Sequence, residues 1–455
     1  MFAQLLKSLF ARAPSATASR PRGAPLQDTR LAAQQAQRAE YEARHAELTR
    51  RLQLEGDSLE LLLDLGHLCY QLDRDAECED LLKRALAIDP NQPVALCGLG
   101  MVVFTHGRME ESEHYLRRAL AVAPTERSIL FSLAMTLLGR GNYPEGYRYF
   151  SSRLAGPARL GEKIARLPAW RGEPLTGKSL VLWSDWGGFG DELAYVRFAR
   201  VIRERYKPAR LVAAVPRPLV RLFADQPYLD EVAGISEGAS ADLQCSLIEA
   251  VTVIGTTVDT VPSWPAYLEV PEREMQVWRA TLRDEKRLKV GLAWSGGAGE
   301  PGPGLTTARL DKHLPAQAMQ CLIGVPNLVF VSLQKGDHAG RASDLLPGAA
   351  LIDETDSLGD FGDTAALIMA LDLVVAVDTA VAHLSGALGR PTLLLLKRSG
   401  GYFWPEGRND TPWYPSIRIV RQHAHGDWSE AVLQVRAVLE RMAAGAAWPD
   451  CFDSA

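Results

Sequence analysis

A repeat of 34 residues in the first third of the chain constrains the fold more than any other feature. Three consecutive windows have this length, over Asp57–Pro90, Asn91–Pro124 and Thr125–Ala158. Within each window a small residue and a large apolar residue recur at fixed positions: Cys78, Ser112 and Gly146, then Leu82, Leu116 and Phe150. A period of this length with ordered small and large positions predicts pairs of helices that stack into an array.

The registers of the three windows agree at further positions. These are Leu65-Gly66, Leu99-Gly100 and Leu133-Ala134, and the closing Pro90 and Pro124. The pattern resembles the tetratricopeptide repeat (TPR). The resemblance implies a concave helical surface that holds a peptide or a partner protein. A short array that only caps the next domain, or forms a dimer, is the alternative, and the repeats alone do not choose between them.

Composition excludes several classes of protein. The chain has 455 residues, of which 47% are hydrophobic, and a formal net charge of −5. It is long enough for several domains, and its charge gives no support for nucleic-acid binding. Six cysteines are scattered without a CxxC pair, which predicts reduced thiols, no zinc site and a cytoplasmic location. No run approaches the roughly 20 apolar residues that a membrane span needs.

The first 13 residues have apolar side chains at helical spacing. Phe2, Leu5, Leu6, Leu9 and Phe10 form the apolar set. The segment lacks the continuous apolar core and the cleavage site of a secretory signal. One interpretation is a frayed helix before a linker rich in Ala, Ser, Pro and Arg. The other is weak peripheral contact of residues 1–13 with the inner membrane.

The remaining two thirds alternate between strand and helix patterns. After a linker at 167–177, apolar runs predict strands at 179–184, 209–215, 231–236 and 241–247, with helices that include 192–206 and 217–225. A helical connection at 273–284 leads to a second series, which begins at 289–296 and continues through LVFVSLQKG, ALIDET, LVVAVDT and PTLLLL. This alternation predicts two parallel sheets, each with helices on its faces.

The segment 374–391 carries the clearest chemical signal. Its apolar strand ends in Asp378-Thr379 and opens a small-residue helix with His383 one turn in. Such a junction exposes free backbone N–H groups at the carboxyl edge of a sheet, where phosphorylated ligands bind. The glycine-rich turn at 185–191 follows the first predicted strand in the same way. Two nucleotide-fold halves facing each other are the expected arrangement.

Three segments resemble the heptosyltransferase-like family of GT-B glycosyltransferases: GFGD at 188–191, TTARLDKHLP at 306–315 and DTAVAHL at 378–384. The order of repeats before transferase, with SLQKG at 332–336, DTAALI at 363–368 and TPWYPS at 411–416, looks like the TPR-linked bacterial members of this family. The resemblance covers roughly residues 166–440. It implies an α plus α/β chain, in which helical repeats precede a GT-B fold of two Rossmann-like domains.

The resemblance also implies roles for residues. Asp191 corresponds to the base that activates the acceptor hydroxyl, and Lys312 to the lysine against the donor phosphates. Asp378, Thr379 and His383 correspond to the donor-binding segment. Ala380 stands where glycine is common, and Gly188 and Gly190 belong to the turn before the base. Two departures are Leu314 in place of an aromatic residue and Ala308 within the usual Thr-Arg pair.

Each assignment has a structural alternative. Asp191 and Asp378 are also suited to cap the helices that follow them. Lys312 would be an ordinary surface lysine, and His383 a hydrogen-bonded core histidine. Trp404, Trp413, Tyr414 and Trp428 are interpreted as core or edge aromatic residues rather than as a sugar-stacking platform.

The predicted domains follow from these patterns. They are a tail at 1–27, a TPR domain at 28–165, an acceptor-side half at 166–285, a nucleotide-sugar half at 286–440 and a tail at 441–455.

The leading function is a hexosyl- or heptosyltransferase-like enzyme that uses a nucleotide-diphosphate sugar. Its expected acceptor is a protein, a glycan or a lipopolysaccharide precursor, and its expected mechanism is inverting, without metal or cofactor. A TPR adaptor with a degenerate transferase domain is the alternative, because the turn departs from the Glu-Gln-Gly-Leu-Gly-Asp of TPR-linked relatives. An NAD-dependent oxidoreductase is disfavoured, because Leu193 occupies the third glycine position of the fingerprint.

Overall fold

The structure is a computed structural model that describes residues 26–151, 162–184, 188–296, 312–336, 342–398, 400–424 and 426–453. Residues 1–25 of the predicted tail at 1–27, the last residues of the third repeat, Asp185-Trp186-Gly187 and the TTARLD segment lie outside the described residues. The chain divides into two compact units, with the boundary between Arg140 and Gly141. Each unit is described by itself.

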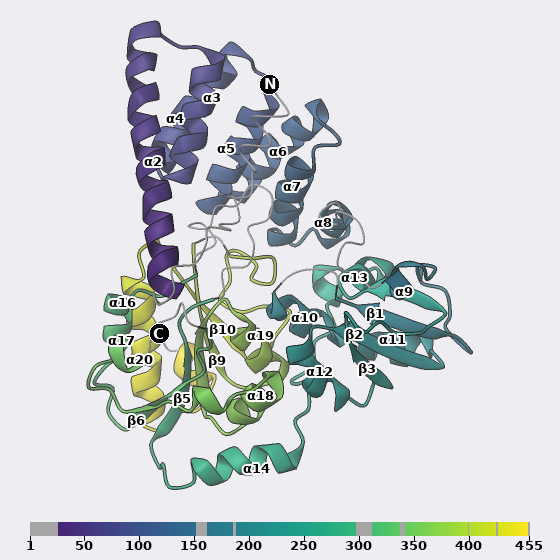
Figure 1. Ribbon diagram of the computed structural model, residues 1–455. Coiled ribbons are helices and arrows are strands. Elements are labelled where there is room, and N and C mark those ends of the chain that lie inside the picture. The colour runs from purple at the N-terminus through teal and green to yellow at the C-terminus, as the bar shows by residue number, and fades with distance from the viewer. Residues whose placement is uncertain are drawn as a thin grey trace. The chain divides into compact units, whose positions relative to one another are not determined.

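Unit 1 consists of consecutive helices that pack side by side (Figure 1). They are α2 (Leu26–Glu55), α3 (Leu59–Gln71), α4 (Asp75–Ile88), α5 (Pro93–Thr105), α6 (Met109–Val122) and α7 (Arg127–Gly139). The turns between paired helices repeat as well, because Asp73 and Gly107 have positive φ of 59° and 73° at equivalent positions. Glycine and aspartate tolerate this left-handed conformation better than most residues.

The small and large positions of the repeat meet in the core of unit 1. A β-carbon at Gly66 would lie 2.8 Å from Leu82, and one at Gly100 would lie 2.6 Å from Leu116. The leucine side chain of the second helix therefore packs directly against the glycine of the first helix. This close approach explains why both positions recur with the period of the repeat, and it confirms the predicted helical repeats.

The array begins half a repeat earlier than the three windows indicate. Leu48 of α2 stands one period before Leu82 and is buried in the same way. The C-terminal part of α2 packs on α3 as α4 packs on α5. It therefore serves as the second helix of an incomplete repeat, and it covers an apolar face of α3 that would otherwise be exposed.

Helix α8 (Tyr143–Phe150) stands at the position of the second helix of the third repeat, yet its contacts place it in unit 2. It packs against α13 (Glu249–Ile254) of that unit. Its buried face is aromatic, with Tyr143, Tyr147 and Phe150. The last helix of the repeat pattern is thus part of the α/β body.

The first sheet of unit 2 is parallel, with strand order β3-β2-β1-β4. Its strands are β1 (Ser179–Trp183), β2 (Arg210–Val215), β3 (Glu231–Gly234) and β4 (Leu243–Ser246). The accompanying helices are α9 (Glu162–Ala165), α10 (Phe189–Tyr195), α11 (Arg197–Tyr206) and α12 (Arg217–Ala224). The single helix predicted at 192–206 is wrong in its start and continuity, since α10 begins at Phe189 and a break at Val196 separates it from α11.

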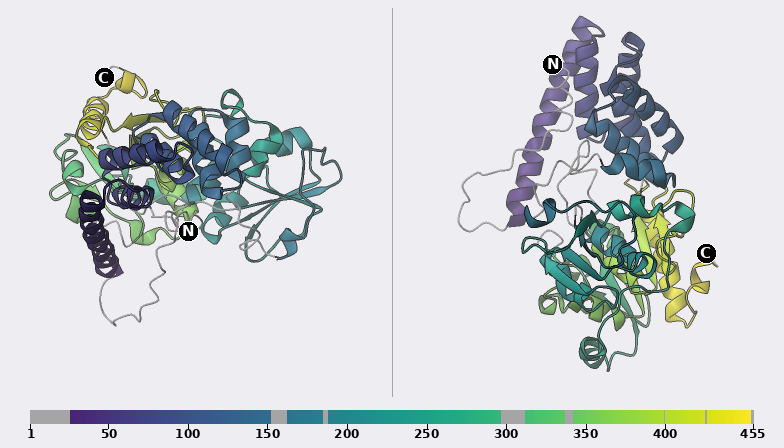
Figure 2. Two further views of the ribbon diagram at one scale, coloured as in Figure 1. Left: turned by 90° about the horizontal axis from the view of Figure 1, so that it is seen from above. Right: turned by 90° about the vertical axis from the view of Figure 1, so that its right-hand side faces the viewer.

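The second sheet is also parallel, with strand order β10-β9-β8-β5-β6-β7. Its strands are β5 (Leu288–Ala293), β6 (Leu328–Ser332), β7 (Leu351–Ile352), β8 (Leu373–Val377), β9 (Thr392–Leu396) and β10 (Ile417–Arg421). Helices α16 (Ala316–Gln320) and α20 (Ser429–Ala443) pack on one face, and α18 (Phe361–Met369) and α19 (Ala380–Ala387) lie on the other (Figures 1 and 2). Helix α14 (Glu272–Thr281) joins the two halves, and α17 (Ala342–Leu345) and α21 (Asp450–Asp453) complete the second one.

These two sheets confirm the predicted fold class of helical repeats followed by two Rossmann-like, GT-B-type domains. β10 and α20 were not predicted from the sequence. Both follow the aromatic loop at 400–416, where neither period is regular. In each half, a glycine-rich or polar junction follows the carboxyl end of a central strand, which is where the candidate residues lie.

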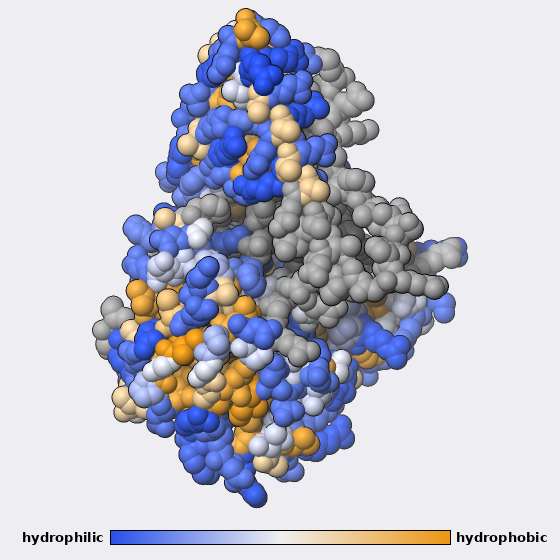
Figure 3. Space-filling model, turned by 60° about the vertical axis from the view of Figure 1, so that its left-hand side comes forward, coloured by the Kyte–Doolittle hydropathy of each residue, from blue (hydrophilic) through white to orange (hydrophobic). Residues whose placement is uncertain are grey.

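Surface character differs over the face seen in Figure 3. Hydrophilic residues cover most of the helices of unit 1 there, whereas apolar residues gather in one area of unit 2. Partly buried apolar side chains, including Leu288, Leu351, Met442 and Trp448, surround the core of the second sheet. Among the described residues, no helix has both the length and the apolar character required to cross a bilayer.

Candidate functional site

The second half of unit 2 concentrates polar contacts on one carboxylate at the end of β8. Asp378 accepts from Lys312 Nζ at 2.5 Å through Oδ2, and from Trp404 Nε1 at 2.9 Å through Oδ1. His383 Nε2 lies 3.7 Å from Oδ1. The sequence predicted Lys312, Asp378 and His383 as site residues, and the structure brings these three side chains together.

The electrostatics of Asp378 keep it ionised. Burial alone would raise its pKa, but the charge of Lys312 and the hydrogen bond from His383 hold the pKa well below its usual range. The carboxylate is therefore a fixed negative charge that is already balanced by its neighbours. This arrangement suits an organising role, because both oxygens are occupied by donors.

The start of α19 lies beside this carboxylate. Thr379 is the N-cap residue, but its side chain makes no capping hydrogen bond. Its Oγ1 is buried and has no hydrogen-bond partner among the described residues. The first N–H groups of a helix lack intrahelical acceptors, and here they begin at Ala380. A β-carbon at Gly296, in the loop after β5, would lie 3.5 Å from Thr379 Cγ2 and 3.6 Å from Lys312 Cβ, so the backbone of this loop passes close to both residues. These groups form an uncapped helix start next to a cation.

His383 is buried beneath this site and has defined partners. Its Nδ1 lies 2.8 Å from the hydroxyl of Tyr414, and its ring is 4.7 Å from that of Phe403. Burial raises the pKa of Tyr414 well above its usual value, so the phenol stays protonated. The fully buried Arg197 stacks 4.7 Å from the Tyr414 ring and donates to the Trp413 carbonyl oxygen at 2.6 Å. His383 therefore has the environment of a core histidine and also lies at the site.

Asp191 lies on the turn that opens α10 in the first half. Its Oδ2 accepts from the Gly188 N–H at 3.2 Å, so the carboxylate does cap the helix. Its Oδ1 accepts from the hydroxyl of Tyr402 at 2.5 Å. Tyr402 belongs to the loop after β9, in the other half of unit 2. One carboxylate thus joins the glycine turn of the first sheet to the aromatic loop of the second.

The two halves meet where these residues lie. A β-carbon at Gly190 would be 2.7 Å from Cδ2 of His383, so the backbone of the turn rests on the imidazole. Phe189 and Phe361 add a contact between rings at 5.0 Å. Through these contacts, Asp191 on one side and Lys312, Asp378 and His383 on the other belong to one continuous cluster.

Sequence reasoning missed the aromatic contribution to this cluster. Tyr402, Trp404 and Tyr414 each donate to, or share a hydrogen bond with, a predicted site residue. Trp404 and Tyr414 are buried, as expected of core aromatics, but their polar atoms face the site. The available signal was the density of Tyr and Trp in GYFWPEG and TPWYPS, which does not reveal where a phenol or an indole N–H points.

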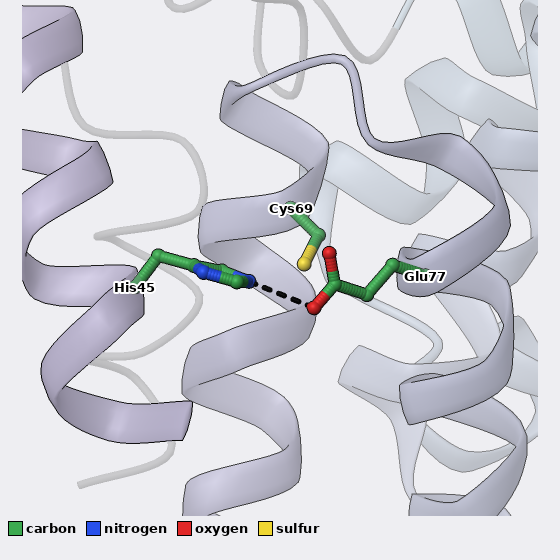
Figure 4. Close-up of side chains that lie close together, drawn as sticks. All are labelled: His45, Cys69 and Glu77. Atoms are coloured by element: carbon green, nitrogen blue, oxygen red, sulfur yellow. Dashed lines mark hydrogen bonds and ion pairs between the residues drawn. The ribbon is translucent and has the colours of Figure 1, made fainter. Parts of the chain in front are cut away.

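A second polar cluster lies in unit 1, between α2, α3 and α4. His45, Cys69 and Glu77 each have one atom that could bind a metal ion, and these three atoms lie within 4.8 Å of one another (Figure 4). Glu77 Oε1 lies 2.9 Å from His45 Nε2, and Arg74 Nη1 lies 3.0 Å from His45 Nδ1. The arginine can only donate, so Nδ1 accepts and Nε2 carries the proton. In this arrangement the nitrogen that faces Glu77 is protonated, and the cluster is satisfied as hydrogen-bonded packing.

Comparison with known sequences agrees with the site. Residues 354–431 match the model of glycosyltransferase family 9 (heptosyltransferase), a segment that includes Asp378, Thr379 and His383. Protein FlbA of Caulobacter vibrioides is 27% identical over 298 residues, which cover 60% of this chain and 48% of FlbA. The chain thus spans about half the length of this curated relative.

Solved structures overlap with the chain to a limited degree. The E. coli ADP-heptose LPS heptosyltransferase II has a TM-score of 0.42 and 15% identity, over 58% of this chain and 98% of that one. A mutant of the Thermobaculum terrenum O-GlcNAc transferase has a TM-score of 0.29 and 15% identity, over 99% and 95%.

The predicted resemblance is confirmed: the chain joins tetratricopeptide-like helical repeats to a domain similar to glycosyltransferase family 9. The family match supports a sugar-transferase function.

Proposed function

We propose that the protein transfers a sugar from a nucleotide-diphosphate sugar to an acceptor hydroxyl, with inversion and without a metal. The observation that carries this proposal is the uncapped start of α19 beside Lys312. There the buried Thr379 hydroxyl lacks a partner among the described residues, and the helix contributes N–H groups and the positive end of its dipole. An anionic leaving group fits such a site.

Each polar residue then has a distinct task. Breaking the bond between sugar and diphosphate places negative charge on the leaving phosphate, which Lys312 and the α19 N–H groups stabilise. Asp191 takes the proton of the acceptor hydroxyl as the new glycosidic bond forms. Asp378 does not face the phosphate itself, because its oxygens already accept from Lys312 and Trp404. It holds these donors and His383 in place.

The family match supports a nucleotide-sugar donor and a glycan acceptor. The name of the E. coli ADP-heptose LPS heptosyltransferase II includes a specific sugar nucleotide, ADP-heptose. We do not assign that donor to this chain. For this chain we propose only the shared class, a sugar linked through a nucleoside diphosphate. For the acceptor we propose two alternatives: a protein that is held by the helical repeats, or a lipopolysaccharide precursor.

Calorimetric titration with ADP, GDP and UDP tests the donor site. One nucleoside diphosphate should bind to the wild-type protein, and Lys312→Ala and Thr379→Val should weaken it, whereas Asp191→Ala should not. Lys289→Ala is the matched control, because Lys289 also pairs with an aspartate of the same half, Asp372, at 3.0 Å. Equal binding by wild type and Lys312→Ala, or binding of none of the diphosphates, contradicts the proposal and favours the non-catalytic adaptor.

A further inference from the structure

Helix α8 contacts Tyr402 and also α10, the helix that carries Asp191, the hydrogen-bond partner of Tyr402. Its Tyr147 hydroxyl lies 3.0 Å from the hydroxyl of Tyr195, on the same helix as Asp191. Its Phe150 ring packs edge-on against Tyr402 with ring centroids 5.3 Å apart. One short helix thus holds the element that carries the carboxylate and the loop that carries the phenol.

A third contact fixes α8 to the second half. Trp413 Nε1 donates to the hydroxyl of Tyr143 at 2.7 Å. The three aromatic side chains of α8 that make these contacts, Tyr143, Tyr147 and Phe150, are buried. The helix therefore cannot shift along either half without breaking a hydrogen bond or a ring contact.

From these contacts we infer that α8 is a working part of the transferase, in which Phe150 and Tyr147 hold Tyr402 against Asp191 and so aim the base. Tyr402 is a positioning residue, because it acts through the Asp191 carboxylate to which it donates. The inference rests on the proposed function of Asp191, and it assigns to the final helix of the repeat pattern a role inside the catalytic body.

The chemistry of the contact fits this role. Burial and the neighbouring carboxylate raise the pKa of Tyr402 well above its usual value, so the phenol remains a hydrogen-bond donor. A donor to Oδ1 stabilises the ionised carboxylate and fixes its rotation. Oδ2 is fixed in the same way by the Gly188 N–H. A carboxylate held at both oxygens presents its remaining lone pairs in one direction, which is what a base needs.

The test compares Tyr402→Phe, Phe150→Leu and the double variant. Turnover is followed as release of the nucleoside diphosphate from the sugar nucleotide that calorimetry selects, with water as the acceptor. We expect Tyr402→Phe to lower turnover about tenfold, since it removes one hydrogen bond to a charged group. Its donor affinity should be unchanged, and the acid limb of the pH–rate profile should move to higher pH, because the ionised carboxylate loses a donor.

Phe150→Leu should shift the profile in the same direction by less, and it should add nothing in the Tyr402→Phe background. Arg148→Ala is the control, because that side chain lies on the exposed side of the same helix. Additive effects of the two variants, or an unshifted pH–rate profile in Tyr402→Phe, overturn the inference.

A separate measurement distinguishes failure of this inference from failure of the proposed function. The same cycle of variants is measured by denaturant unfolding of the full chain, which requires no substrate. If the unfolding free energies of the Phe150 and Tyr402 variants are not additive, but no nucleotide binds, then the contact exists and the proposed transferase function is wrong. If nucleotide binds and is turned over, but the two substitutions are additive in both turnover and unfolding free energy, then the role assigned to α8 is wrong.

Discussion

The two carboxylates of the cluster differ in how their surroundings hold them. Asp378, whose side chain is 12% exposed, is bound by a lysine, an indole N–H and a nearby imidazole of its own half. Asp191 lies half-buried on the first turn of α10 in the first half, and its partners include one backbone N–H and one phenol from elsewhere in unit 2. The first site is complete within one half, whereas the second is assembled from several elements.

The two environments match the roles that we propose for the two carboxylates. A site for a leaving diphosphate must be preorganised, because its stabilisation is electrostatic and depends on fixed donors. A base must keep an accessible oxygen and stay free to change its protonation state. The contrast predicts that changes at Asp378 affect donor binding and stability, and that changes at Asp191 affect turnover while leaving donor binding intact.

The largest effect is expected from Asp191→Asn. Loss of the base should reduce turnover by about 10²–10⁴-fold, with donor affinity close to that of the wild-type protein. Steady-state kinetics and calorimetry on the same preparation check this. A variant that retains full turnover would remove Asp191 from the chemistry.

Asp378→Asn should act differently. It should lower the free energy of unfolding by about 1–3 kcal/mol and weaken nucleotide binding, because Lys312 and His383 lose their charged partner. Because the pKa of Asp378 is lowered in the folded protein, its stabilisation is fully present at neutral pH.

That stabilisation is lost only as the pH falls below the unfolded value of about 4. The difference in melting temperature between wild type and Asp378→Asn should therefore be largest near pH 7 and shrink in acid. A difference independent of pH would contradict the ionised pair.

The contact between the halves is tested by a pair of glycines on one turn. Gly190→Ala should cost about 1–3 kcal/mol and reduce turnover, since the new methyl group would press on the imidazole of His383. Gly188→Ala is the matched control, because among the described residues the nearest atom to its new β-carbon would be the backbone nitrogen of Gly190, at 4.0 Å. Equal effects of the two substitutions, measured by denaturant unfolding, would show that the turn does not rest on His383.

The smallest effect is expected at Arg221, where α12 of the first half meets α18 of the second. Its guanidinium pairs with Asp360 and Asp363, and both carboxylates also bond within the first turn of α18. The group is partly exposed, so Arg221→Ala should cost no more than about 1 kcal/mol, and salt should diminish the difference.

Arg200→Ala serves as the control for Arg221, because Arg200 pairs within its own helix with Glu204. If Arg221→Ala lowers the free energy of unfolding several times more than Arg200→Ala does, and salt does not change the difference, then this ion pair holds the halves together more strongly than its exposure indicates.

Much of the fold was predictable from the sequence because it depends on local periodicity. The small and large positions at Gly66 and Leu82 recur with the repeat, and the strands around Val181 and Val375 are short apolar runs. The strand-to-helix junction at Asp378 was also recognisable, since the residue types and their order are local.

The contacts that complete the cluster were not predictable in this way. Tyr402 and Asp191 are far apart in the sequence, and the bond between them depends on how two sheets face each other. The place of α8 is similar, because its repeat position predicts a stacked helix while its aromatic side chains pack on the α/β body. Periodicity records which face of a helix is buried, but it does not record what buries it.

The central claim is that the start of α19 and Lys312 bind the diphosphate of the donor. A crystal structure of the protein with the nucleoside diphosphate that binds in calorimetry tests it most directly. We predict a phosphate within hydrogen-bond distance of the backbone N–H of Ala380, of Thr379 Oγ1 and of Lys312 Nζ. A nucleotide bound elsewhere, with these three groups free of phosphate, would contradict the account.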